Sequence, residues 1–214
     1  MPPKSRSSKA TTTATSAKSK TVSSVAQLAA LSAAAMKTTV KVGDPSEDAS
    51  MKHARPILSR INEAGFVTID SQMGDLESAW YKQRAYVSGI IAKSRRDAIM
   101  RALHEKDVIA ISMAHRDCKW IPDAGKIYLT VSEIKPAGGG DHTGLPVGNA
   151  DSFETGVWLN LLPELELKSD KKSMAAIKKD SCLLHVIDAV WGRKRWLFDQ
   201  VLDALRKSQS NTST

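Results

Sequence analysis

Residues 61–72, Ile-Asn-Glu-Ala-Gly-Phe-Val-Thr-Ile-Asp-Ser-Gln, contain a helix end, a buried strand and the start of a loop. Apolar residues at helical spacing run up to Ala64, and Gly65 is typical of the position just beyond a helix C-terminus. The β-branched and aromatic run 66–69 predicts a buried strand. The polar triplet 70–72 then predicts that this strand opens into a loop.

Strands and helices alternate outward from this stretch. Apolar and β-branched runs predict strands over 85–91, 108–113, 127–134, 157–162 and 182–190, and amphipathic spacing predicts helices over 94–105 (capped by Ser94), 173–179 and 196–207. The continuous apolar run 108–113 is expected to be covered on both faces. The glycine- and proline-rich segment 135–149 is expected to be a long loop. The alternation predicts an α/β fold, a three-layer domain with a mixed sheet of about five or six strands.

The net charge of +8 is unevenly distributed along the 214 residues, which suffice for one globular core. Residues 1–52 hold eight basic and three acidic residues and no aromatic one, whereas 53–214 hold 23 basic and 20 acidic residues. Because such a basic segment buries too little apolar surface to order itself, we expect a disordered arm. A short Ala-rich helix at about 24–36 is expected within it, docked on the domain or on a partner. A single domain over 53–207 and a disordered tail over 208–214 complete the predicted organisation.

Composition and motifs exclude several classes of protein. No apolar run approaches the roughly 20 residues that cross a bilayer, so no membrane association is expected. Two cysteines, Cys118 and Cys182, are too few for a disulfide scaffold and favour a reducing, intracellular compartment. The chain has no Gly-x-Ser-x-Gly and no Gly-x-x-x-x-Gly-Lys, so neither that nucleophile turn nor a phosphate-binding loop of that kind is expected. We expect no cofactor.

A wider pattern accompanies the opening stretch. Its further blocks are Trp80, Gln-Arg-Ala-Tyr-Val at 83–87, Gly89, Asp188 and Trp-Gly-Arg at 191–193. Together the blocks resemble an uncharacterised α/β family of actinobacterial and large DNA virus proteins. The resemblance covers about residues 55–205. It implies the α/β fold and is compatible with a viral or virion protein, and it implies no activity because none is established for that family.

Seven polar residues lie where predicted strands end or begin, which is where binding groups of α/β sheets gather. They are Asp70, Ser71, Gln72, Gln83, Arg84, Asp188 and Arg193. Carboxylates, amides and guanidinium groups brought together can bind a phosphate, a carboxylate or a base edge. The structural alternatives are an ion pair between Asp70 and Arg84, and a packing corner in which Trp191 fills a gap beside solvated charges.

Two patterns carry metal-ligand residue types without predicting a metal site. Asp123 and Glu133 match the carboxylates of a divalent-metal nuclease, but an extended strand between them holds them about 33 Å apart. Cys182 and His185 are residue types that zinc accepts. Residues three apart on a strand point to opposite faces, so these two are expected to diverge.

The arm provides the first functional hypothesis. Lys4, Arg6, Lys9, Lys18 and Lys20 can neutralise phosphates by counterion release, which predicts an electrostatic tether to nucleic acid or to another anionic assembly such as a virus particle. The alternatives for the arm are a targeting segment and a solubilising tail.

Two further hypotheses concern the folded part. The first is a hydrolase or transferase acting on a phosphorylated or nucleic-acid substrate, with the seven polar residues around one pocket and the segment 135–149 as its lid. The second is an interaction module in which Trp80 and Trp120, both in predicted loops, anchor a protein partner.

Overall fold

A computed structural model describes residues 22–38, 49–77, 81–114, 127–134, 142–147 and 171–210. Its helices are α1 (Val25–Thr38), α2 (Ala49–Glu63), α3 (Arg96–His104), α6 (Lys171–Lys179) and α7 (Trp196–Ser210), with the 3-10 turn η2 (Lys93–Arg95) before α3. Its strands are β1 (Phe66–Gln72), β2 (Tyr81–Gln83), β3 (Tyr86–Ala92), β4 (Val108–Ala114), β5 (Ile127–Ile134), β6 (His142–Val147) and β7 (Ser181–Asp188).

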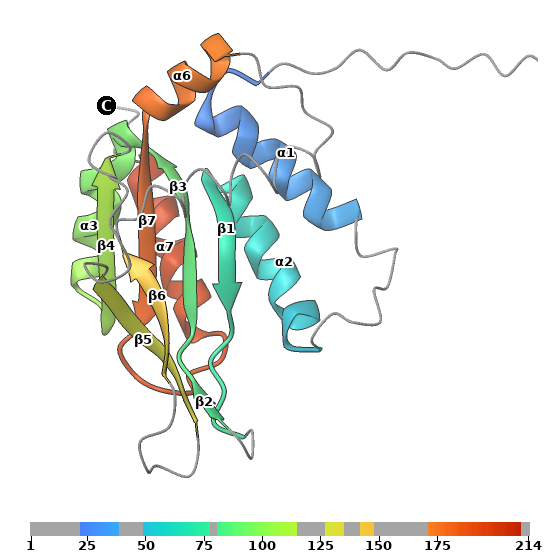
Figure 1. The fold of residues 1–214 in the computed structure, drawn as a ribbon. Coiled ribbons are helices and arrows are strands. Elements are labelled where there is room, and N and C mark those ends of the chain that lie inside the picture. The colour runs from blue at the N-terminus through green and yellow to red at the C-terminus, as the bar shows by residue number, and fades with distance from the viewer. Residues whose placement is uncertain are drawn as a thin grey trace, which may run out of the picture.

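The described strands form two antiparallel sheets (Figure 1). The larger has four strands in the order β1-β3-β7-β4, and the smaller has three in the order β2-β5-β6. Every neighbouring pair is antiparallel. The α/β class is therefore confirmed, but the expected mixed sheet of five or six strands is wrong. Strands β3 and β4 are joined by α3 as in a parallel unit, yet β7 from the far end of the chain pairs between them and removes the parallel pairing.

Helices cover both faces of the four-stranded sheet (Figure 1). On one face, Ile61 of α2, Leu103 of α3 and Leu202 of α7 belong to the main apolar cluster. On the other, Leu28 of α1 and Ile177 of α6 pack in a second, smaller cluster. The strands contribute alternate residues to the two clusters because successive side chains of a strand point to opposite faces.

Helix α1 corresponds to the helix expected within the arm. Its first turn is capped by Ser24, whose Oγ accepts a 3.2 Å hydrogen bond from the backbone N–H of Gln27. Leu28 is fully buried against the sheet. Helix α1 is thus part of the folded core, and the chain that precedes Val22 is joined directly to it.

The start of α3 differs from its prediction. The expected cap at Ser94 is wrong, because η2 precedes the helix and Arg95, without a side-chain cap, occupies the capping position. The Arg95 guanidinium donates instead to the carbonyls of Ala64 and Leu205 at 2.6 and 2.5 Å and to Ser208 Oγ at 2.7 Å. These bonds join η2 to the ends of α2 and α7, and α7 continues to Ser210, beyond its predicted end at 207.

Two strand predictions are corrected by the sheet order. Strand β4 lies at an edge of the four-stranded sheet and its residues are only partly buried, so it is not covered on both faces. Strand β6 lies within the segment 135–149 that was expected to be entirely loop. It contains Pro146, which lacks a backbone N–H, and it pairs only with β5 among the described strands. Proline is tolerated on such an edge strand because the unpaired side of the strand needs no backbone N–H donor.

Candidate functional site

Four polar side chains share the face of the larger sheet opposite α2, α3 and α7. Asp70 on β1 pairs with Ser88 on β3, which pairs with His185 on β7. Tyr86 lies two residues before Ser88 and therefore on the same face. The strand order β1-β3-β7 thus aligns a carboxylate, a hydroxyl and an imidazole side by side, with a phenol next to them.

Two hydrogen bonds link these four residues in pairs. The Tyr86 hydroxyl donates to Asp70 Oδ2 at 3.1 Å, and Ser88 Oγ shares a 2.8 Å bond with His185 Nδ1. Ser88 is 4% exposed and His185 3% exposed. The second ring nitrogen of His185, Nε2, is buried without a hydrogen-bond partner among the residues that the structure describes. A buried unpaired ring nitrogen costs about 1–3 kcal/mol, so this atom departs from ordinary core packing.

Burial sets the protonation of this group. It lowers the pKa of His185 to about 4, so the imidazole is neutral at pH 7. Partial desolvation raises the pKa of the Asp70 carboxyl. The hydrogen bond from Tyr86 acts in the opposite direction and lowers that pKa. Desolvation, and then the nearby Asp70 charge, raises the pKa of the Tyr86 phenol. A neutral imidazole beside a serine hydroxyl can accept the proton of that hydroxyl, which is the chemistry of a general base.

A second polar group occupies the corner between β7 and α7. Arg193 Nε lies 3.0 Å from each carboxylate oxygen of the fully buried Asp188, and Arg193 Nη2 donates to Oδ1 as well. The backbone N–H of Val190 donates to the same oxygen at 2.8 Å. Gly192 turns the chain here with a positive φ of 76°, and a Cβ on it would meet the side chain of Leu76. The hydrogen bonds of Asp188 are therefore used within the protein.

Arg84 belongs to this corner. Its Nη1 donates to the carbonyls of Asp188, at 3.0 Å, and of Ala189. Its guanidinium lies 4.2 Å from the centre of the Trp191 ring, with Lys82 Nζ 4.8 Å from the same ring. The Arg84 guanidinium thus contacts this corner, and Asp70 is hydrogen-bonded to Tyr86 instead.

The seven residues predicted around one pocket are therefore distributed over two places. Asp70, Ser71 and Gln72 are the last three residues of β1 and pair with β3, so the expectation that this triplet opens a loop is wrong. The Asp70 side chain joins the sheet-face group. Gln83 Nε2 donates to the carbonyl of Arg84 at 2.9 Å, beside the corner of Asp188 and Arg193. Each of the two groups is a separate candidate.

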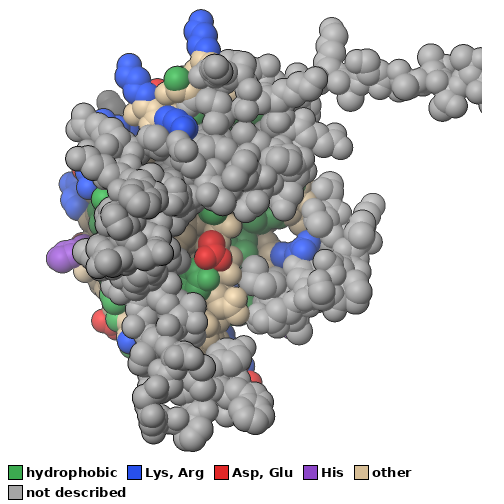
Figure 2. Space-filling view, in the orientation of Figure 1, with side chains coloured by type: hydrophobic (Ala, Val, Ile, Leu, Met, Phe, Trp, Pro, Cys, Tyr) green, Lys and Arg blue, Asp and Glu red, His purple; other side chains and the backbone are tan. Residues whose placement is uncertain are grey.

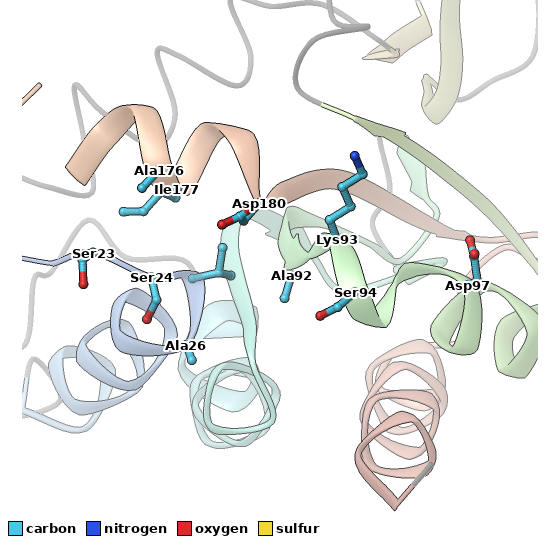
Figure 3. Close-up of a pocket in the computed structure, with 11 residues that line it drawn as sticks. Ser23, Ser24, Ala26, Ala92, Lys93, Ser94, Asp97, Ala176, Ile177 and Asp180 are labelled. Carbon is cyan, nitrogen blue, oxygen red and sulfur yellow. The ribbon is translucent and has the colours of Figure 1, made fainter. Parts of the chain in front are cut away.

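Lysines gather at the opposite end of the larger sheet, around α6. The helix has the sequence Lys-Lys-Ser-Met-Ala-Ala-Ile-Lys-Lys, and Figure 2 shows basic side chains projecting over this end of the molecule. The backbone N–H of Lys93 donates to the carbonyl of Asp180 at 2.8 Å, which sets η2 beside the end of α6. Figure 3 shows the hollow between α6, the start of α1 and η2, with Ser24, Lys93 and Asp180 among its lining residues.

Several predicted residues lie outside the described part of the chain. These are the arm residues Lys4, Arg6, Lys9, Lys18 and Lys20, the tryptophans Trp80 and Trp120, Asp123, and the predicted strand 157–162. Within the described ranges, no three His, Cys, Asp or Glu side chains come together as metal ligands do. Cys182 and His185 face opposite sides of the sheet, as the strand periodicity predicts. No helix in the described part of the chain is both long enough and apolar enough to span a membrane.

One protein family matches almost the whole chain. The model of a domain of unknown function, DUF6919, matches residues 11–208. The chain belongs to the DUF6919 family. No curated protein matches the sequence. The DUF6919 match includes α1 and every other described helix except the last two residues of α7, in agreement with the packing of α1 in the core.

Sequence reasoning missed Tyr86, Ser88 and His185 as a group in this DUF6919 protein. Each lies in a run that predicts a strand correctly, but the face on which it lies depends on register. One signal was available, because Tyr86 and Ser88 alternate with Val87 and the buried Gly89. That alternation places two polar groups on one face of β3. The partners on that face could not be known without the strand order.

Proposed function

We propose that this DUF6919 protein binds nucleic acid through the cationic arm that precedes α1, as an electrostatic tether. The proposal rests on one observation, the concentration of charge. Lys4, Arg6, Lys9, Lys18 and Lys20 are the charged residues before Val22, and no acidic residue accompanies them. Nucleic acid offers a continuous row of phosphates, and binding by such an arm gains free energy from the release of condensed counterions.

The anchoring of the arm supports the same proposal. Val22 and Val25 are buried beside Leu28, so the folded core begins two residues after Lys20 in the sequence. Phosphate contacts of this kind carry no sequence information, so binding is expected to be independent of base sequence. In a virus particle, packaged nucleic acid would be the corresponding partner.

The test uses the full chain with the five arm cations changed to Gln, because deleting residues 1–41 would also remove the core helix α1. Fluorescence anisotropy of a labelled duplex and a labelled single strand is expected to show at least about tenfold weaker binding at about 50 mM salt. A control of equal charge carries Lys106→Gln, Lys194→Gln, Arg195→Gln, Arg206→Gln and Lys207→Gln. Equal affinities for the wild type and the arm variant would refute the proposal.

A second candidate function is catalysis by a hydrolase or transferase acting on a phosphorylated or nucleic-acid substrate. The observation that favours it is the buried pair of Ser88 and His185, in which Nε2 has no hydrogen-bond partner within the described ranges. Ser88 Oγ would attack the phosphorus of a phosphate ester while its proton passes to His185 Nδ1. The ester oxygen would leave and take up that proton, and water, or an acceptor hydroxyl in a transferase, would then release the phosphoryl group from Ser88. Hydrolysis of bis-p-nitrophenyl phosphate that disappears in Ser88→Ala, with an unchanged melting temperature, would support it. Equal rates in both proteins would exclude Ser88 as the nucleophile.

A further inference from the structure

Helix α6 presents a stripe of lysines opposite its buried residue. Ile177 is 2% exposed and packs in the second apolar cluster, whereas Lys172 and Lys179 are exposed. The two lysines are seven residues apart, which places them on one face of a helix about 10 Å from each other along its axis. Neither has an ion-pair partner within the described ranges. Their charge is therefore available to a partner.

The first described residues of the chain lie against the buried side of the same helix. Val22 and Val25, at the beginning of the described chain, belong to the same apolar cluster as Ile177 of α6. Ser24, just before α1, and Ile177 of α6 both line one hollow of about 680 Å³ (Figure 3). The first described residues of the chain thus pack against the Ile177 side of α6, the helix whose other side carries the exposed lysines.

This end of the domain carries an excess of positive charge. Lys93 and the four lysines of α6 accompany two acidic residues, Asp97 and Asp180, which leaves a net charge of +3. Long-range attraction of a polyanion therefore acts at this end.

The hollow itself is not suited to an anion. Asp97 and Asp180 line it together with Lys93, Ser23 and Ser24. Two carboxylates beside one ammonium repel a phosphate from the interior. The favourable path for a polyanion therefore runs outside the hollow, across the exposed face of α6.

We infer that the exposed face of α6, with Lys172 and Lys179, is a second contact for the nucleic-acid backbone, continuous with the arm. This inference rests on the proposed function and adds to it the surface of the domain that the nucleic acid follows. Each lysine that neutralises one duplex phosphate contributes about 0.9 to the slope of log Kobs against log salt. Two contacts therefore contribute about 1.8.

The test is the double variant Lys172→Gln/Lys179→Gln in the full chain, titrated with labelled duplex. We expect its salt slope to be shallower than the wild-type slope by about 1.8, so that its loss of affinity between about 50 and about 200 mM salt is roughly tenfold smaller. The matched control is Arg206→Gln/Lys207→Gln on α7, which removes the same charge on the opposite face of the larger sheet from α6. Its slope is expected to equal that of the wild type.

The outcomes separate the two proposals. If the arm variant binds weakly but the α6 variant keeps the wild-type slope, the inference about α6 is overturned and the tether stands. If the arm variant binds like the wild type, the proposed function fails, whatever α6 does. Equal changes in the α6 and α7 variants would mean a net-charge effect and would also overturn the α6 contact. Tighter binding to phosphatidylserine vesicles than to duplex, lost in the α6 variant, would overturn nucleic acid as the partner.

Discussion

Replacing Arg193 by Met is expected to destabilise the fold strongly, because it leaves the Asp188 carboxylate buried with little compensation. Asp188 is fully buried, and Arg193 Nε lies 3.0 Å from both of its oxygens. After the substitution, the Asp188 carboxylate keeps the hydrogen bond from the backbone N–H of Val190, at 2.8 Å, and loses those from Arg193. Breaking a buried pair by removing one partner costs about 3–5 kcal/mol. For a chain of this size, that corresponds to a decrease in melting temperature of about 6–20 °C.

The assay is thermal and urea unfolding followed by circular dichroism, with two reference variants. Lys194→Met removes an exposed pair, Lys194 Nζ to Glu77 Oε1 at 2.8 Å, and should lower the free energy of unfolding far less than Arg193→Met does, because solvent screens that pair. The double variant Asp188→Asn/Arg193→Met should recover a large part of the loss, since a neutral amide is less costly to bury than an unpaired carboxylate. If Arg193→Met were no more destabilising than Lys194→Met, the corner would not depend on this ion pair.

Three further predictions concern the sheet and α1. The pKa of His185 is about 4 in the folded state and ordinarily 6.5. The wild type should therefore lose on the order of 3 kcal/mol of stability as pH falls from about 6.5 towards 4, because protons bind the unfolded state more tightly. Unfolding titrations should find this part of the pH dependence absent in His185→Gln. A Cβ on Gly89 would stand 2.0 Å from the Val67 carbonyl oxygen, so Gly89→Ala should cost about 3 kcal/mol in urea unfolding; a loss below about 0.5 kcal/mol would contradict this register. Leu28→Ala should cost about 2–5 kcal/mol because Leu28 is fully buried, and Ser24→Ala about 1 kcal/mol; unchanged melting temperatures would show that α1 is not docked.

Local patterns predicted the elements better than their arrangement. The run 66–69 and the alternation over 127–134 predicted strands where β1 and β5 lie, since period and β-branching act within a few residues. The order of strands is a long-range property. Strand β7 pairs with β3 about 95 residues away, as in the pair of Ser88 with His185, and no local signal encodes this. The expectation of a mixed sheet failed for that reason.

The candidate site shows the same difference between local sequence patterns, which are predictable, and long-range strand order, which is not. Asp70 was singled out because a carboxylate at a strand end is visible in the sequence. Ser88 and His185 lie within strands, where each residue taken alone is typical of a core position. Their hydrogen bond can be known only from the register of β3 and β7. Asp188 and Arg193 were predicted around a pocket, or at a packing corner with Arg193 as a solvated charge, and the structure instead pairs Arg193 with the buried Asp188. Their mutual hydrogen bonds and the stacking of Arg84 on Trp191 identify tight internal packing there.

The most direct test of the central claim is the salt dependence of duplex binding by the intact chain. Five arm cations that each neutralise one phosphate predict a linear plot of log Kobs against log salt with a slope of about −4.5, and steeper if α6 contributes. The slope should be the same for duplexes of unrelated base sequence. A slope near zero, or no binding at about 50 mM salt, would contradict the account of an electrostatic tether.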